Sequence, residues 1–578
     1  MTTLAGSEQF REESLWFGTT DRPLFGRLTM PNGDTSRGGV LLSPPIGRES
    51  RLARRALRSL AIVLAIDGFV TLRYDHFGTG DSSGSIDDDE LDRAWMEGVD
   101  QGVALLRSLG ITSVSAVGMR LGATIVGTAA AAYDLELSSF VMWDPCETGR
   151  TYTRELGALG ALHRDTVTTV LDESTEMLEY ALSEEAAVRV NQFTLIEPTP
   201  RELAERVLVV ARDDRPVSRR FRSRWESEHV EWATTSEQGP LFEAQLPSSV
   251  QPTSTIARIR EWLTSSALPP APFSSRAHSR EAVVIESSNS LPVRESVVEL
   301  GFRKMFAIVS EPIGDVRGPL MVMVNGVNED HVGPARLWVE LSRRWASWGL
   351  RCVRFDLSEL GESPWIPGQP DRPVWDRTRP QDIGDAVRAL SLANPADSVL
   401  VGYCSGAPLA IVVAQRLKNR GVCAINPQVG AGVFQNVGRV KRSDRESVQS
   451  LVRRVENLLL RHRWVDQAIH QTTRLLLSSA YPPRINPALI ENHSEMLLVL
   501  SPEDLSPLRR NPIFGWFLRR RLVPSEHVQI EIVPGLDHNI LSTIGRGRAV
   551  GILDQYVIET FLGGVVRSDA DRIGVDGS

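Results

Sequence analysis

The strongest constraint on the fold is an internal repeat, because the two halves of the chain carry the same short motifs in the same order. The matched segments are 70–82 and 352–363, 117–123 and 401–407, 143–145 and 425–427, 209–214 and 499–504, and 227–230 and 525–528. The spacing between matched segments stays similar and rises overall toward the end of the chain, as insertions into loops produce, whereas chance similarities would scatter. The sequence therefore predicts a tandem duplication of one domain.

Domain boundaries follow from the repeat and from local composition. The 578 residues are enough for more than one domain, since a domain has roughly 100–200 residues. Residues 265–280 are rich in Pro, Ser and Ala and lack apolar periodicity, which is typical of a linker. We therefore expect domains at 1–264 and 281–566 that pair with each other within the chain. The polar tail at 567–578 is expected to be disordered.

The second half predicts an α/β architecture. Short apolar runs ending in turn residues are typical of buried parallel strands, and they occupy Pro319–Asn325, Arg351–Leu357, Ser398–Cys404, Gly421–Pro427, Met496–Pro502 and Val528–Pro534. Helical patterns separate several of them, at Leu337–Trp348, Ile383–Leu392 and Ala407–Leu417. This alternation favours a central, mostly parallel sheet flanked by helices. Residues 443–478, between two strands, have apolar residues at helical spacing and predict a helical lid, with 151–187 as the counterpart in the first half.

The motif Gly402-Tyr403-Cys404-Ser405-Gly406 joins a predicted strand to a predicted helix. A Gly-x-nucleophile-x-Gly motif in this place forms a sharp turn that presents a nucleophile, because small neighbours let the strand and the helix approach closely. The motif makes Cys404 a candidate nucleophile. The alternative is that Cys404 is a small buried side chain, since two glycines at this spacing are common.

Two candidate partners follow Cys404 in the order acid, then histidine. Asp504 follows one predicted strand, and His538 follows the next. Side chains at the carboxyl ends of parallel strands converge on one edge of the sheet. We therefore predict a Cys404–His538–Asp504 triad. The adjacent Glu503 is an alternative to Asp504, and a loop histidine that caps a helix is the alternative role of His538.

With these motifs, each half of the chain resembles a member of the α/β-hydrolase superfamily, similar to its serine-aminopeptidase and dienelactone-hydrolase branches. The resemblance covers roughly residues 15–263 and 283–563. It implies two tandem α/β-hydrolase domains. In the second, it implies that Cys404 is the nucleophile, that His538 is the general base and that Asp504 orients the histidine.

The resemblance also implies an oxyanion hole of backbone N–H groups, from Ser405 and from Gly326 or Val327 in the loop after the first core strand. Such a site attacks an ester or thioester carbonyl and forms an acyl-enzyme. The acceptor decides between an acyl hydrolase of the esterase or thioesterase type and an acyltransferase, and the sequence leaves both open. The expected partner is a small acyl ester or thioester, free or bound to a carrier. The rival hypothesis is a catalytically silent binding or scaffold protein.

The first half departs from this pattern at both reactive positions. Its turn carries Arg120 in place of the cysteine, and arginine cannot act as a nucleophile. Asp214 remains at the acid position, but residues 238–243, where the base is expected, contain no histidine. We therefore expect a non-catalytic domain in which Arg120 pairs with Asp214. The alternative is that Arg120, at the start of a helix, binds a carboxylate or phosphate ligand.

Basic residues cluster in and next to the predicted lid of the second half, at Arg439, Lys441, Arg442, Arg445, Arg453, Arg454, Arg461 and Arg463. We interpret them as a solvated helix face, and the alternative is a landing surface for an acidic carrier protein or a coenzyme A phosphate. His331 lies beside the predicted oxyanion loop. We expect it to be a surface loop histidine, with a role in lining the pocket as the alternative.

Composition excludes several other classes of function. A net charge of −8 argues against binding of nucleic acid or of an anionic membrane. The four cysteines form no Cys-x-x-Cys pair, and the start of the chain lacks the pattern of a signal peptide. No apolar run reaches the length of about 18 residues that a membrane helix needs, so we expect a cytoplasmic protein. No metal-ligand spacing, Walker-type loop or dinucleotide fingerprint occurs, and we expect no cofactor.

Overall fold

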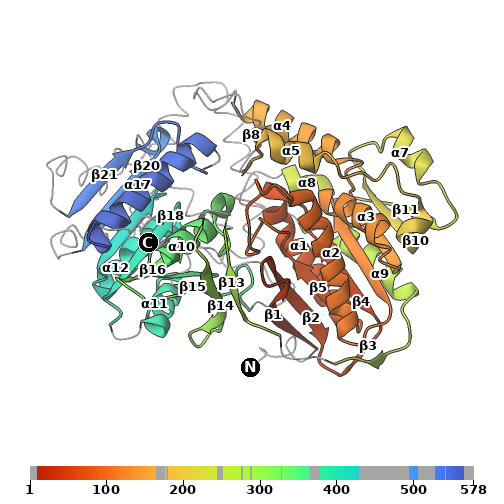
Figure 1. Ribbon diagram of the computed structural model, residues 1–578, viewed down its shortest axis with the longest axis horizontal. Coiled ribbons are helices and arrows are strands. Elements are labelled where there is room, and N and C mark those ends of the chain that lie inside the picture. The colour runs from red at the N-terminus through yellow and green to blue at the C-terminus, as the bar shows by residue number, and fades with distance from the viewer. Residues whose placement is uncertain are drawn as a thin grey trace, which may run out of the picture.

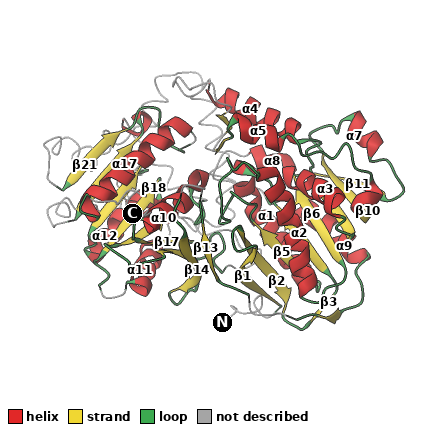
Figure 2. Cartoon of the chain, viewed as in Figure 1, coloured by secondary structure: helices red, strands yellow, loops and turns green. Residues whose placement is uncertain are grey.

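The computed structural model describes residues 9–164, 176–177, 180–243, 251–274, 278–286, 290–326, 329–364, 378–391, 394–428, 494–505, 527–540 and 542–564. Two large β-sheets, one from each half of the chain, lie side by side (Figure 1). Helices cover both faces of each sheet (Figure 2). None of the helices in this part of the chain is both long and apolar enough to cross a membrane.

The first sheet has the strand order β1-β2-β5-β4-β6-β7-β10-β11. The strands are β1 (Phe10–Gly18), β2 (Pro23–Pro31), β4 (Gly39–Ser43), β5 (Val70–Tyr74), β6 (Val114–Met119), β7 (Leu137–Trp143), β10 (Ala204–Arg212) and β11 (Val230–Thr235). Strand β2 is antiparallel to both of its neighbours, and the strands from β5 to β11 are parallel.

The second sheet has the strand order β13-β14-β15-β17-β16-β18-β19-β20-β21. The strands are β13 (Glu281–Val284), β14 (Val293–Leu300), β15 (Met305–Pro312), β16 (Leu320–Val324), β17 (Arg351–Phe355), β18 (Ser398–Tyr403), β19 (Gly421–Ile425), β20 (Glu495–Leu500) and β21 (Val528–Ile532). Apart from the additional edge strand β13, the order and the strand directions repeat those of the first sheet.

Helices pack on both faces of each sheet through buried apolar side chains. In the first half these are α1 (Gly47–Ile66) and α9 (Thr253–Ser265) on one face, and α2 (Leu91–Ser108) and α3 (Leu121–Tyr133) on the other. In the second half they are α10 (Leu337–Ser347) and α17 (Thr543–Phe561) on one face, and α11 (Arg379–Leu390) and α12 (Gly406–Leu417) on the other. The smaller elements are β3 (Thr35–Ser36), α4 (Gly149–Arg164), β8 (Glu176–Met177), β9 (Tyr180–Ala181), α5 (Glu184–Val190), α6 (Pro200–Leu203), α7 (Arg219–Arg224), α8 (Gln238–Glu243), β12 (Ala271–Pro272) and the 3-10 helix η1 (Pro334–Arg336).

A parallel core with antiparallel strands along one edge, in this order, is the α/β-hydrolase fold, and it occurs twice in the chain. The predicted α/β class and the tandem arrangement are therefore confirmed. The predicted strands of the second half are present as β16 to β21, with ends that differ by a few residues. The sequence did not predict β14, because its residues alternate between buried and exposed positions instead of forming one apolar run.

The segment expected to be a linker contacts the first half of the chain. Ala271–Pro272 pair with Thr35–Ser36 in a short antiparallel ladder, and the Phe273 side chain is buried. A proline-rich segment can add a short edge strand where the pairing does not need the missing N–H of proline. Of the two predicted lids, residues 443–478 lie outside the described residues, while α4 and α5 form the described parts of the other.

Candidate functional site

Cys404 lies on the predicted sharp turn between β18 and α12. Its φ of 51° is in the left-handed region, which non-glycine residues adopt rarely and mostly at functional turns. The two flanking glycines are required by close packing. A Cβ atom on Gly402 would lie 2.6 Å from Cα of Ala407, and one on Gly406 would lie 2.4 Å from the carbonyl oxygen of Asn325. The motif therefore places the cysteine at the carboxyl end of a core strand and at the start of a helix.

The three residues of the predicted triad lie in one hydrogen-bonded row. Cys404 Sγ is 3.4 Å from Nε2 of His538, and Nδ1 of His538 is 2.8 Å from each carboxylate oxygen of Asp504. Asp504 accepts a further hydrogen bond of 2.7 Å from the Ser501 hydroxyl. The geometry favours Asp504 over Glu503 as the partner of the histidine, and it places His538 within reach of the sulfur.

The electrostatics of this row favour the protonated form of His538. Burial alone would lower the pKa of His538, but hydrogen bonds with Asp504 and Cys404 and the negative charges on both raise it to about 10. The imidazole ring therefore carries a proton at neutral pH and faces the sulfur. The Cys404 thiol is also 3.5 Å from Oε1 of Gln428, whose backbone N–H donates to the Cys404 carbonyl oxygen.

Sequence reasoning missed Asn426, which holds the two loops of the acid and the histidine together. Its side-chain amide donates to the carbonyl oxygens of Asp537, at 2.9 Å, and of His538, at 3.1 Å. The amide oxygen accepts from the Ser501 backbone N–H at 2.7 Å, and the residue is fully buried. Its signal in the sequence is the Asn426-Pro427 pair, which matches Asp144-Pro145 of the first half and follows the equivalent strand. The match supports the repeat but does not by itself indicate a role for the residue.

Two of the three candidate oxyanion residues, Ser405 and Gly326, lie within the part of the chain that the structure describes. Ser405 immediately precedes α12 and is fully buried, and its backbone N–H belongs to the first turn, where helix N–H groups have no partner within the helix. Gly326 lies against the nucleophile, because a Cβ atom built on it would be 3.3 Å from Cβ of Cys404. Val327 lies outside the described residues. The structure therefore brings both Ser405 and Gly326 next to Cys404.

The equivalent position in the first half is filled by Arg120, whose φ of 54° matches that of the cysteine. Its guanidinium donates to Glu49 at 3.1 Å, to Asp144 at 3.3 Å and to Glu155 at 2.6 Å. The Phe242 ring covers it at 5.8 Å, and the Arg120 side chain is only 5% exposed. Three carboxylates and an aromatic ring therefore enclose the cation.

This enclosure corrects two expectations about Arg120. The predicted partner, Asp214, lies elsewhere and is held by Arg212 through two hydrogen bonds of 2.8 and 2.7 Å. Glu49 and Glu155 pair with Arg120 in place of Asp214, because α1 and α4 bring them to the turn. Their positions along the sequence did not indicate this proximity. The alternative, a ligand anion at Arg120, is also wrong, because the protein's own carboxylates occupy the guanidinium. Burial raises the pKa of Asp144 to about 6 even beside this cation.

The expectation that His331 is a surface histidine is wrong. Its side chain is fully buried, with Nδ1 at 2.8 Å from Asp356 and Nε2 at 2.7 Å from Asp81 of the other half. Residues 329–331, which follow the candidate oxyanion residues, contact the first half of the chain, so this histidine is an interface residue. The basic cluster from Arg439 to Arg463 lies outside the described residues.

Comparisons with known proteins agree with the fold. No family model and no curated protein matches the chain. Among solved structures, it is similar to the proline iminopeptidase of Mycobacterium smegmatis, with 13% identity over 44% of this chain and 98% of that chain and a TM-score of 0.32. It is also similar to Est1E from Butyrivibrio proteoclasticus, with 15% identity, 44% and 98% coverage and a TM-score of 0.32. A third is the dienelactone hydrolase of Anabaena variabilis, with 16% identity, 45% and 100% coverage and a TM-score of 0.28.

Each of these structures spans about half of this chain, and at these identities the likeness concerns the fold alone. The strand order on its own defines the class: the chain is a tandem protein of the α/β-hydrolase fold. The second copy has a cysteine, a histidine and an aspartate in a hydrogen-bonded row. The first copy has a buried arginine at the equivalent turn that forms ion pairs with three carboxylates.

Proposed function

We propose that the second domain is a cysteine-dependent acyl hydrolase or acyltransferase that acts on an ester or thioester. The observation that carries the proposal is the continuous row from Cys404 Sγ through His538 to Asp504, built on a strained turn. A partly buried polar row of this kind has an orienting acid, a proton carrier and a nucleophile in contact, which is the arrangement that covalent acyl transfer requires.

The proposed reaction begins with the thiolate of Cys404 facing the imidazolium of His538. The thiolate attacks the substrate carbonyl carbon, and the carbonyl π electrons move to the oxygen, which the N–H groups of Ser405 and of the Gly326 loop stabilise. When the intermediate collapses, the bond to the leaving group breaks and His538 gives it the proton. The neutral imidazole then takes a proton from the acceptor, which attacks the acyl-enzyme and releases Cys404. Water as acceptor gives hydrolysis, and an alcohol, amine or thiol gives acyl transfer.

The proposed substrates are small acyl esters or thioesters, free or bound to a carrier, because a thiolate exchanges readily with a thiolate leaving group, and protonation by His538 allows the poorer alkoxide of an ester to leave as an alcohol. Asp504 keeps the ring oriented, and it stabilises the protonated form that precedes proton donation. A reducing compartment suits an accessible nucleophilic thiol, and the four cysteines are free, so we propose a cytoplasmic location. The first domain has neither nucleophile nor base and is proposed to be non-catalytic.

The first test is alkylation of Cys404 by iodoacetamide across pH, followed by intact mass and peptide mapping. Cys146, Cys352 and Cys423 are buried, and burial raises the pKa of each thiol. One label is therefore expected, on Cys404, and it should form near neutral pH faster than on a free thiol. His538→Ala should remove this reactivity. His527→Ala is the matched control, since His527 lies at the other end of β21 and pairs with Glu495.

The second test is detection of a covalent acyl-enzyme after mixing with p-nitrophenyl esters and acyl thioesters of different chain length. We expect an acyl mass on Cys404 in the wild type, and none in Cys404→Ala. If Cys404 reacts no faster than a free thiol and no acyl mass forms, the catalytic proposal fails. The rival hypothesis, a catalytically silent binding or scaffold protein, would then be the better account of the duplicated fold.

A further inference from the structure

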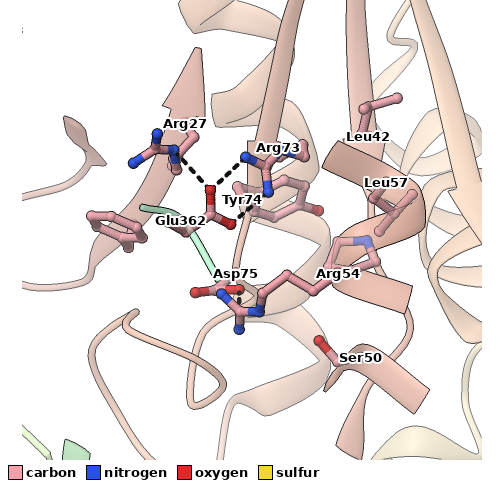
Figure 3. A pocket seen from close by; sticks show the side chains of 12 residues that line it. Arg27, Leu42, Ser50, Arg54, Leu57, Arg73, Tyr74, Asp75 and Glu362 are labelled. Atoms are coloured by element: carbon pink, nitrogen blue, oxygen red, sulfur yellow. Dashed lines mark hydrogen bonds and ion pairs between the residues drawn. The ribbon is translucent and has the colours of Figure 1, made fainter. Parts of the chain in front are cut away.

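The two domains pack through equivalent residues on each side of their interface. Arg354 of the second domain donates to Asp81 of the first, at 3.2 Å. In the reciprocal pair, Arg73 of the first donates to Glu362 of the second through two bonds of 2.8 Å (Figure 3). The repeated aspartate is Asp75 in the first half and Asp356 in the second. In each half the arginine lies two residues before this aspartate, and the acid lies six residues after it. Such reciprocity is the mark of a pseudo-two-fold interface.

The same reciprocity extends to the helices at the interface. Arg58 of α1 donates to the carbonyl oxygens of Gly361, at 2.6 Å, and Ser363, at 3.1 Å. Arg343 of α10 donates to those of Asp81, at 2.5 Å, and Ser82, at 3.0 Å. The apolar centre is also shared, as Phe25 and Phe306 face each other with ring centroids 6.2 Å apart. Most of the interface therefore follows from duplication of one surface.

Within the described residues the symmetry breaks at the additional strand β13, which contacts β1 and β2, and at the connection that follows the first parallel core strand. In the first domain, residues 44–46 alone connect β4 to α1. In the second, residues 325–336 connect β16 to α10, and they begin with the candidate oxyanion loop. The additional residues of this longer connection have no counterpart in the first domain. Its contacts with the first domain are therefore not a by-product of duplication.

Three side chains of the first domain hold this connection. Arg51 pairs with Glu329, and Arg54 pairs with Asp330 at 2.8 Å. Asp81 accepts from Nε2 of His331, whose backbone N–H donates to Asp356 at 2.7 Å. The Glu329 side chain is 5% exposed and the Asp330 side chain 10%. Buried carboxylates without partners are unfavourable, so the connection needs the opposite domain to keep this conformation.

The connection also lies directly beside the reactive sulfur. Gly326 is next to Cys404, and the backbone N–H of Glu329 donates to the Gly326 carbonyl oxygen at 3.4 Å. The Asn325 carbonyl oxygen lies so close to Gly406 that a Cβ atom there would be 2.4 Å away. A shift of residues 329–331 would therefore be transmitted to the backbone that faces the substrate carbonyl.

We propose that the non-catalytic domain positions the oxyanion loop of the catalytic one, through Arg51, Arg54 and Asp81. This inference rests on the proposed function in one respect, namely that Gly326 belongs to the oxyanion hole. The three side chains do not touch the reacting atoms and act as positioning residues. The first domain is thereby part of the catalytic machinery, since an oxyanion hole stabilises the transition state only when its donors are held in place.

The test is hydrogen exchange measured by mass spectrometry on the full chain, in peptides that cover residues 325–336. In Arg51→Gln/Arg54→Gln we expect exchange in these peptides to be at least about tenfold faster, which corresponds to about 1.4 kcal/mol of opening free energy. Glu329→Gln/Asp330→Asn removes the same ion pairs from the other domain and should have the same effect. It keeps the test valid if the arginine variant folds poorly. Arg73→Gln is the matched control, because it removes an interdomain pair that ends on Glu362.

Two further measurements, the alkylation rate of Cys404 and kcat, separate this inference from the proposed function. Alkylation of Cys404 should stay within about twofold of wild type in the loop variants, whereas kcat for an acyl substrate should fall at least about tenfold at similar KM. Unchanged exchange in both loop variants, or equal acceleration in Arg73→Gln, overturns the positioning role. If the wild-type thiol is unreactive but the loop exchange responds as expected, the domain contact stands and the catalytic proposal alone is lost.

Discussion

Replacing Arg120 with Met tests whether the cation in the first domain holds its degenerate site together. The change removes the ion-pair partner of Glu49 and Asp144, whose side chains are 10% and 11% exposed, while Glu155 keeps its pair with Arg215. Removing one partner of a buried ion pair costs about 3–5 kcal/mol. In a domain of this size each kcal/mol lowers Tm by about 2–4 °C, so we expect a loss of about 6–20 °C at pH 7.5.

The loss should depend on pH in a defined direction. Burial raises the folded-state pKa of Asp144 from 3.8 to about 6, and burial also raises the pKa of Glu49 despite the charge of Arg120. Stability from a group with a raised pKa is fully present below its unfolded pKa and is lost as pH rises through its folded pKa. Without Arg120 both carboxyls bind protons more tightly. The loss in Tm should therefore be smaller at pH 5 than at pH 7.5.

The assay is differential scanning calorimetry of the full chain, with the transition of the first domain followed at both pH values. Arg120→Met/Asp144→Asn should recover part of the lost Tm at pH 7.5, because it removes one unpaired charge. Arg93→Met, which removes an exposed pair with Glu97, should leave Tm unchanged. A stable Arg120→Met protein at pH 7.5, or one equally destabilised at both pH values, would refute the reasoning.

Three more predictions concern the second domain and the interface. Asn426→Asp keeps the acceptor for Ser501 but loses both amide donors, so alkylation of Cys404, measured by intact mass, should slow several-fold. An unchanged rate would refute the idea that Asn426 holds the loops of Asp504 and His538 together. Gly406→Ala places a Cβ atom 2.4 Å from a backbone carbonyl oxygen, and it should lower Tm or the soluble yield strongly, whereas Gly547→Ala, with open space at its Cβ, should not. Burial alone would lower the pKa of His331, but Asp356 and Asp81 raise it well above 6.5. The Tm advantage of wild type over His331→Gln should therefore be greatest below pH 6.5 and shrink at alkaline pH, and a constant difference from pH 6 to 10 would contradict this.

Local features of the second half could be predicted because they are encoded in adjacent residues. The glycines around Cys404 permit only a sharp strand-to-helix turn, and that turn presents its central side chain at the sheet edge. The order of Asp504 and His538, each after a strand, brought them to the same edge, since parallel strands end together. What spacing left open was the choice between Asp504 and Glu503. The hydrogen bonds to His538 favour Asp504.

The residues that surround Arg120 were not predictable in this way. Glu49 and Glu155 belong to helices that precede and follow the turn by many residues, and only the packing of α1 and α4 brings them together. Asp214, which the chain order favoured, is instead paired with its near neighbour Arg212. A buried guanidinium binds the carboxylates nearest in space, and sequence order carries little information about that distance.

The sequence by itself determined that one α/β domain occurs twice, that only the second copy has a cysteine and a histidine at the positions predicted for a nucleophile and a base, and where those residues lie along the chain. The tertiary structure alone decided how the copies meet, with Arg73 reaching Glu362 and Arg354 reaching Asp81 across the interface. It also decided that His331 is buried between two aspartates. The physical reason is that periodicity and turn motifs specify the local backbone. Pairing between buried charges depends instead on which surfaces come into contact, and burial makes that pairing obligatory.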